Sequence, residues 1–214
     1  MSRLARTLLL LLLMVLLPPG LAADPAPPPT PSAPGQPEFA SLRGQLLIAT
    51  PQMGDPRFAH TVILMVRHEA AGALGIVLNR PVAARSVAEL LAAINRPTDG
   101  VAGTIGVFLG GPVEPGAGFI VHSSEYQGGG RERMDVDGRL AVSLDPDVLA
   151  DIGHGKGPAK ALFALGYAGW GPGQLEGEMA RRDWFTAPAS PRLVFDEDRD
   201  KLWDVAMSVR TRDL

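Results

Sequence analysis

The sequence predicts a single α+β domain built on a coiled, largely antiparallel β-sheet core with flanking helices. Short apolar runs recur along the chain and are separated by glycine and proline, which number 25 and 20 among the 214 residues. Turn dipeptides join neighbouring runs in a way that is typical of hairpins. Helical periodicity appears only in a few short segments, so regular βαβ crossovers are not expected.

The first half of the domain should contain a hairpin, one helix and further strands. The β-branched, apolar run at 61–66 is typical of a buried strand, and a turn at 70–72 leads from it into the next run. Ser86 and Glu89 have the spacing of a capping box, which predicts the start of a helix. The predicted elements are strands at 44–49, 61–66, 75–78, 107–109 and 118–122, with a helix at 86–94.

The second half should begin with another hairpin. Asp137-Gly138 is a strong turn signal in the middle of residues 133–143. Asp145-Pro146 supplies a cap and a first-turn proline for a short helix that ends at Ile152. The remaining predicted elements are strands at 161–165 and 192–195, a helix that opens at Pro172, and an amphipathic helix across 202–209.

The N-terminus reads as an export signal. Arg3 and Arg6 precede an apolar run at 8–17, and small residues follow up to Ala23. The run is too short to span a bilayer, which takes about 20 residues. We therefore expect cleavage near Ala22 or Ala23, an exported and periplasmic protein, and no membrane span after cleavage. The alternatives are that the segment is an uncleaved anchor, or that the true start codon lies further along and the protein is cytoplasmic.

This interpretation divides the chain into three parts. They are a signal peptide at 1–23, a proline-rich linker at 24–37 and one domain at 38–214. The linker contains seven prolines, so it lacks amide donors and apolar bulk and should be an extended tether.

Composition excludes several classes of function. The chain has no cysteine, which rules out disulfides, thiolate catalysis and cysteine–metal sites. Without the predicted signal, which holds two arginines and no acidic residue, 18 basic residues face 23 acidic ones. A mildly acidic domain lacks the basic surface that nucleic acid requires, so no nucleic-acid binding is expected.

Four stretches of the sequence, taken together, resemble the AlgH/YqgE family of bacterial proteins. They occur in the family's order and are residues 47–58, 72–81, 110–113 and 166–176. The resemblance implies one α+β domain with a coiled, bifurcated sheet. It also carries a loose label of transcriptional regulation, and it offers no catalytic residues to transfer. The export signal departs from the family, because an exported protein cannot meet the chromosome.

Polar residues at the ends of predicted strands form the candidate binding site. Short polar side chains at such ends often cap loose backbone groups, and that structural role is the alternative for each of them. The functional hypothesis is that the turns converge into one groove, where Arg80 binds an anion and Trp170 offers a flat contact face. The candidates are Thr50, Asp55, His68, Asn79, Arg80, Gly110, Gly111, Trp170 and Gln174, with Glu176 in the same group of turns.

No catalytic, metal or cofactor site is predicted. The four histidines show no metal-ligand spacing, and no Gly-x-Ser-x-Gly elbow is present. Ser123 follows His122 directly, and adjacent strand residues point to opposite faces, so His122 should not activate it. Gly110-Gly111 follows a strand, as in a phosphate cradle, but neither a helix start nor a lysine comes after it.

Three functions remain open at this point. The first is a non-enzymatic module that binds an unidentified small molecule or protein. The second is a small-molecule hydrolase that uses Asp55, His68 and Arg80, which requires the three side chains to meet in one cleft. The third is a transcriptional regulator, which only the family label suggests.

Overall fold

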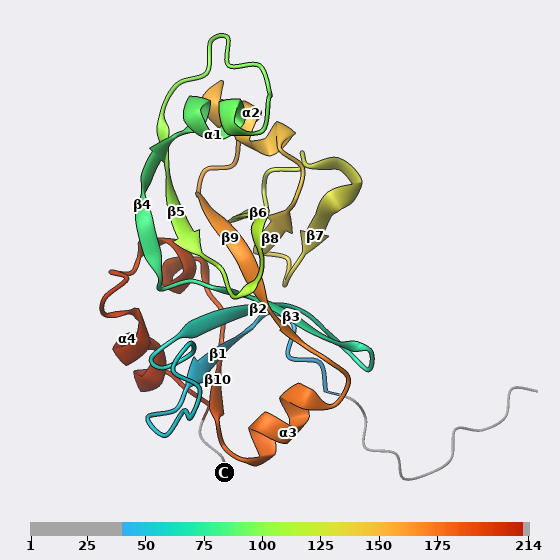
Figure 1. Cartoon of the computed structure of the whole chain (residues 1–214), viewed down its shortest axis with the longest axis vertical. Coiled ribbons are helices and arrows are strands. Elements are labelled where there is room, and N and C mark those ends of the chain that lie inside the picture. Colours follow the sequence, from blue (N-terminus) through green and yellow to red (C-terminus); the bar gives the residue numbers. More distant parts are fainter. Residues whose placement is uncertain (1–39, 212–214) are drawn as a thin grey trace, which may run out of the picture. The chain divides into compact units, whose positions relative to one another are not determined.

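A ten-stranded sheet organises residues 40–211, the part of the chain that the computed structural model describes (Figure 1). The predicted signal peptide and linker lie outside the described residues. The strands follow the order β10-β1-β2-β3-β9-β6-β8-β7, and β4 and β5 branch from β9. Among the strand pairs within residues 40–211, only β5 and β9 run parallel. The α+β class and the largely antiparallel sheet are therefore confirmed.

The strands are β1 (Gln45–Ala49), β2 (Val62–Glu69), β3 (Gly72–Val77), β4 (Pro81–Ser86), β5 (Thr104–Leu109), β6 (Val113–Ser123), β7 (Arg133–Asp135), β8 (Leu140–Ser143), β9 (Ala161–Trp170) and β10 (Trp184–Pro188). The helices are α1 (Val87–Ala93), α2 (Asp147–Gly153), α3 (Gln174–Ala180) and α4 (Leu202–Ser208), with a 3-10 turn η1 (Gly130–Glu132) and a π-helical turn η2 (Arg192–Asp196). α1 and α2 lie at one end of the domain and α3 at the other (Figure 1).

Strand β9 divides the sheet into two branches. Its first residues pair with β6 and with β5, for example Phe163 with Val107. Its last residues pair instead with β3, where Ala73 lies opposite Trp170. Gly166 lies between the two regions with a φ of 70°, a conformation that side-chain-bearing residues rarely adopt. The bifurcated sheet implied by the family resemblance is therefore present.

Gly110 and Gly111 lie where the branches separate. The Gly110 amide donates to the Leu165 carbonyl at 2.8 Å, and the Gly110 carbonyl accepts from the Val77 amide at 2.9 Å. A Cβ atom on Gly111 would lie 2.0 Å from the carbonyl carbon of Tyr167. The close approach of two backbones therefore explains both glycines without a phosphate ligand.

The branch formed by β10, β1, β2 and β3 is buried on both faces. Along β1, Leu46 and Ile48 point into a core that includes η2 and α4, whereas Leu47 and Ala49 point into a core that includes Leu175 of α3. A third core joins α1 and α2 to the other branch, which includes β5 and β6. It contains Val87, Leu91, Ile105, Val107, Ile120, Val148, Leu149 and Phe163.

The structure differs from the sequence predictions at several elements. Residues 192–195 form the π-helical turn η2 rather than a strand, because Pro191 has helical dihedral angles and leads directly into it. Strands β4 and β10 were not predicted, and β9 continues beyond residue 165 to Trp170. Helix α1 begins next to Ser86 as expected, but the Ser86 side chain makes no capping bond. The Val87 amide donates to the Gly103 carbonyl instead, at 3.1 Å.

Candidate functional site

A cleft of about 470 Å³ lies between helix α3 and the loop that joins β1 to β2. We call it the α3 cleft. The β1–β2 loop supplies one wall, and the end of β9, the helix α3 and the start of β10 supply the others. Its lining residues are Met53, Gly54, Asp55, Arg57, Phe58, Pro112, Val113, Gly169, Trp170, Gln174, Glu178, Arg181, Asp183 and Trp184.

Three of the candidate residues meet in this cleft. Asp55 comes from the β1–β2 loop, Trp170 ends β9, and Gln174 begins α3. Thr50 lies next to the cleft rather than in it. Its amide donates to the Asp183 carbonyl at 3.0 Å, while its side chain is buried and its Oγ1 makes no hydrogen bond. Of the candidate residues, Asp55, Trp170 and Gln174 therefore share one cleft.

His68 lies in a different cavity and holds α3 against the sheet. Its Nδ1 accepts the Leu42 amide at 3.0 Å, so the ring proton is on Nε2 and is donated to the Glu176 carboxylate, also at 3.0 Å. The His68 side chain is buried, and the cavity beside it is lined by Arg43, Arg67 and residues of β2 and β7. This pair fixes α3, and with it one wall of the α3 cleft.

Asn79 and Arg80 support the wall that the β1–β2 loop forms, but they do not line the cleft. The Asn79 side chain accepts the Val62 amide at 2.9 Å and donates to the His60 carbonyl at 2.8 Å. Arg80 donates to the Ala59 carbonyl at 2.7 Å. These bonds hold the end of the β1–β2 loop. Both residues line a third cavity, next to Trp203, so Arg80 and Trp170 do not share one groove as the hypothesis required.

This distribution bears directly on the hydrolase hypothesis. Asp55, His68 and Arg80 line three separate cavities, so they cannot act together on one substrate. Within residues 40–211, no three histidine or acidic side chains are grouped so that they could hold a metal ion. No helix in the same part of the chain is long and apolar enough to cross a membrane.

Glu178 is the centre of the α3 cleft, and sequence reasoning missed it. Its Oε2 accepts hydrogen bonds from the indole nitrogens of Trp170 and Trp184, each at 2.8 Å, and its Oε1 accepts from Gln174 Nε2 at 3.0 Å. The two indole rings meet edge to face, with centroids 6.1 Å apart. Gln174 and Glu178 have the i,i+4 spacing that places two side chains on one helical face, and this was the available signal.

The other charges of the cleft are paired at its rim. Arg57 contacts Asp55 at 2.6 Å, and Arg181 contacts Asp183 at 2.9 Å. The hydrogen bond from Arg57 lowers the pKa of Asp55. No cationic side chain among the described residues forms an ion pair with Glu178. The cleft therefore contains one carboxylate whose charge is not balanced by a neighbour.

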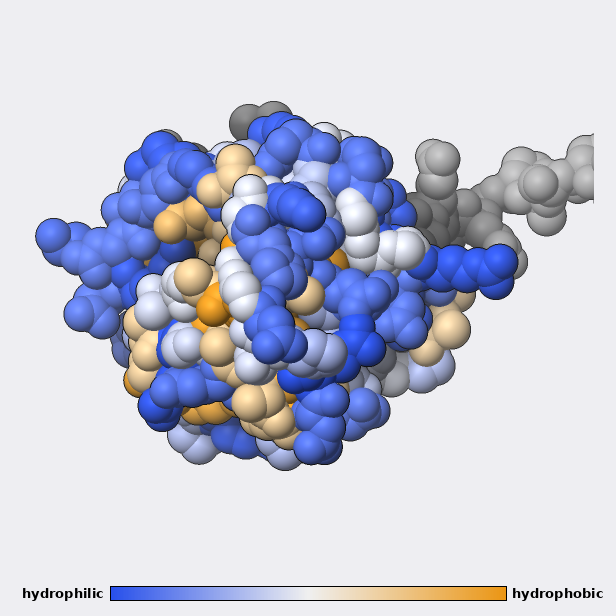
Figure 2. Space-filling model, turned by 90° about the horizontal axis from the view of Figure 1, so that it is seen from above, coloured by the Kyte–Doolittle hydropathy of each residue, from blue (hydrophilic) through white to orange (hydrophobic). Residues whose placement is uncertain are grey.

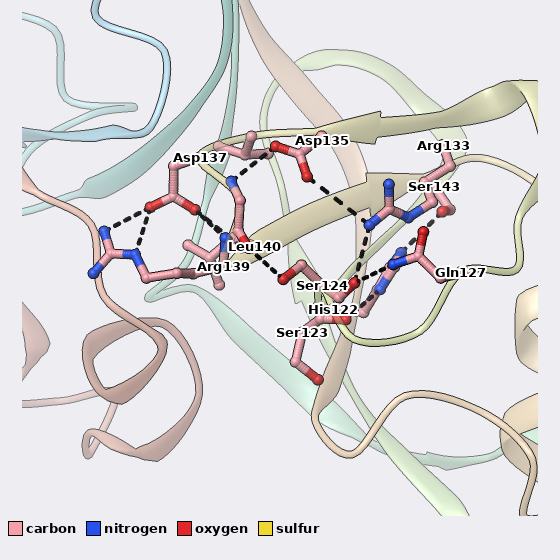
Figure 3. Close-up of polar contacts among 12 residues, drawn as sticks. His122, Ser123, Ser124, Gln127, Arg133, Asp135, Asp137, Arg139, Leu140 and Ser143 are labelled. Carbon is pink, nitrogen blue, oxygen red and sulfur yellow. Dashed lines mark hydrogen bonds and ion pairs between the residues drawn. The ribbon is translucent and has the colours of Figure 1, made fainter.

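A second group of polar residues surrounds His122, where β6 pairs with β8 (Figure 3). His122 Nδ1 donates to the Ser123 carbonyl at 3.0 Å, so Nε2 accepts the Ser143 hydroxyl, also at 3.0 Å. Burial lowers the pKa of His122. The Ser123 hydroxyl turns away and donates to Glu125 at 2.7 Å. Because His122 and Ser143 have no exposed surface, this pair joins β6 to β8 rather than forming an accessible nucleophile.

An apolar cavity of about 440 Å³ lies between α1, α2 and β6. Ile94 and Leu144 on its rim are large and exposed, and Gly116 leaves open space above β6. Seen from the α1–α2 end, the surface is mostly hydrophilic, with hydrophobic residues between the polar ones (Figure 2). Nothing in the described residues indicates what covers this cavity, so the α3 cleft is the stronger candidate site.

Comparison with known proteins gives consistent matches across the domain. A family model described as AlgH-like matches residues 46–213. A UPF0301 protein of Jannaschia sp. (strain CCS1) is 45% identical over 166 residues, which cover 78% of this chain and 86% of that protein. A UPF0301 protein of Sphingopyxis alaskensis is 44% identical, with 77% of this chain and 87% of that protein covered.

Two solved structures are also similar. The solution structure of the AlgH protein from Pseudomonas aeruginosa matches with a TM-score of 0.66 and 36% sequence identity, and it covers 82% of this chain and 92% of that chain. The crystal structure of a protein from Corynebacterium diphtheriae matches with a TM-score of 0.58 and 26% identity, covering 80% and 88%.

Proposed function

The chain belongs to the AlgH-like family, and from this premise and the geometry of the α3 cleft we propose that it is a non-enzymatic module that binds a small molecule in that cleft. The observation that carries the proposal is the Glu178 carboxylate, which two indole nitrogens and one amide hold in place at an open cleft. A side chain fixed by three bonds is pre-organised for a ligand, so little entropy is lost when a ligand binds.

The size and lining of the α3 cleft support this function. Small-molecule sites usually measure about 300–1,000 Å³ and combine apolar walls with a few placed polar groups. The α3 cleft falls within that range, with Met53, Phe58 and Val113 among its apolar residues and Glu178 among its polar ones. The absence of a shared cleft for Asp55, His68 and Arg80 favours binding over turnover.

A fragment screen with a blocking variant tests the proposal. Gly54 lines the cleft, has no atom within 4 Å of an added Cβ, and does not have a left-handed φ, so Gly54→Phe should enter the cleft without unfolding the domain. Gly116→Phe is the matched control, because Gly116 is equally open but lies in the apolar cavity beside β6.

The expected result is selective. In nuclear magnetic resonance titrations of a mixed fragment library, some fragments should shift the indole signals of Trp170 and Trp184 and leave Trp203 unaffected. Gly54→Phe should abolish these shifts, Gly116→Phe should keep them, and the bound fragments should be recovered chemically unchanged. Fragments that bind equally well to Gly54→Phe, or no fragment that shifts either cleft indole, would contradict the proposal.

A further inference from the structure

We infer that the ligand of the α3 cleft is a small organic cation, a primary ammonium or guanidinium compound that forms an ion pair with Glu178. The inference rests on the proposed function, because it assigns a chemical class to the ligand of the same cleft. It depends on the balance of charge in the cleft, on the hydrogen-bonding capacity that Glu178 has left, and on the apolar walls around it.

Charge in the cleft is unbalanced at one position. Of its three carboxylates, Asp55 is paired with Arg57 and Asp183 with Arg181, which leaves Glu178. The donors that bind Glu178 are two indoles and an amide, all of them uncharged. Neutral donors orient a carboxylate but do not cancel its charge, and a charged donor forms a stronger hydrogen bond with it. A cationic ligand would supply the missing charge.

Glu178 can also accept one more hydrogen bond. An ionised carboxylate has about four acceptor positions, and three of those on Glu178 are occupied. An N–H group of a ligand can therefore bind without displacing either tryptophan. An anionic ligand would meet arginines whose charge is already paired, Arg57 with Asp55 and Arg181 with Asp183, and it would be repelled by Glu178.

The walls favour a cation with an apolar body. Phe58 of the β1–β2 loop and Trp184 at the start of β10 meet edge to face, with ring centroids 5.7 Å apart. Met53, Pro112 and Val113 add apolar surface. A charged group at Glu178 and a hydrocarbon or aromatic portion against these residues would satisfy both parts of the cleft. Arylalkylammonium compounds have this combination.

Benzylammonium and benzyl alcohol provide a direct test, because they differ mainly in charge and are nearly equal in size. We expect the wild-type protein to bind benzylammonium about tenfold more tightly than benzyl alcohol at low salt, with the preference falling as salt is added. In Glu178→Gln the preference should fall to within about twofold. Glu89→Gln removes the same charge from an exposed position on α1, at the other end of the domain from α3 and outside the cleft, so it should keep the preference.

A measurement on the wild-type protein covers the case in which Glu178→Gln does not fold. With ¹³C-labelled glutamate, the side-chain carboxyl signal of Glu178 should move on titration with benzylammonium and stay in place with benzyl alcohol.

If benzyl alcohol binds the cleft as tightly as benzylammonium, the charge inference is overturned while the proposed binding function stands. If the fragment screen also finds nothing in the cleft, the proposed function itself fails. Undetectable benzylammonium binding at millimolar concentration, or an unchanged preference in Glu178→Gln, also overturns the inference.

Discussion

At the scale of single residues, His122 links stability to pH. It is fully buried, and burial lowers its pKa below the value of about 6.5 that an unfolded histidine has. Between the two values the unfolded chain binds more protons than the folded one. The free energy of unfolding should therefore decrease as pH falls below about 6.5, with a slope of up to about 1.4 kcal/mol per pH unit.

The measurement is urea unfolding between pH 7 and pH 5.5, a window above the range in which acidic side chains take up protons. His122→Asn should flatten the decrease, because the titrating group is gone. His154→Asn is the control, since His154 is exposed on the surface, and it should retain the wild-type slope. A wild-type slope that persists in His122→Asn would assign the effect to another group.

Part of the candidate site could be predicted from the sequence, because strand-end turns carry recognisable residues. Asp55, Trp170 and Gln174 were found in this way, and they do share the α3 cleft. Glu178 and Trp184 were missed because their role depends on tertiary packing. The i,i+4 relation to Gln174 was visible, but the second indole donor comes from β10, and sequence spacing does not place it beside α3.

At the scale of elements, the branch at β9 depends on glycine. An alanine at position 111 would place its Cβ 2.0 Å from the Tyr167 backbone, which no side-chain movement can relieve. Gly111→Ala should therefore lower the free energy of unfolding by about 3 kcal/mol, the upper part of the range for overpacked sites.

Gly171→Ala is the matched control for this substitution. Its added Cβ has no atom within 4 Å, and Gly171 does not have a left-handed φ. Its unfolding free energy should stay within about 0.5 kcal/mol of wild type, as for ordinary surface substitutions. Equal chemical-denaturation midpoints for Gly111→Ala and wild type would show that the branch can shift to accept a side chain.

Elements with strong local patterns were predicted well, and the edge strands β4 and β10 were not. The apolar runs of β1, β2 and β6 gave clear signals because their side chains are buried. Strand β4 is mostly exposed and pairs only with β5 among the described strands, so no apolar alternation marks it. The apolar residues of η2 were taken for a strand because a short buried run has the same composition in either conformation.

At the scale of the whole molecule, the charge balance argues against DNA binding. DNA affinity depends on clustered lysine and arginine that neutralise phosphates, and this domain has more acidic than basic residues. Several of its arginines also form ion pairs with carboxylates, as Arg139 does with Asp137 and Arg192 with Glu197. We expect no measurable duplex binding at physiological salt. A titration over a salt series checks this, and micromolar affinity that weakens steeply with salt would favour the regulator hypothesis instead.

The N-terminal sequence leads us to propose that the protein is exported and cleaved near Ala22 or Ala23. N-terminal sequencing of the native protein tests the proposal, with a mature chain that begins within the next few residues as the expected result. An intact Met1 on protein from the cytoplasmic fraction would instead favour a retained N-terminus.

The position of β9 in the sheet has a consequence for how the chain reaches its native state. β3 pairs with β9, and β1 pairs with β10. Strands near the start of the domain are therefore synthesised well before the strands with which they pair. Such non-local pairing slows folding, because a long loop must close before the contacts that stabilise it can form. During synthesis, the apolar strands β1 to β3 would have unpaired edges until residues 161–188 emerge. The newly made chain should therefore depend on chaperones during this interval and be most prone to aggregation then.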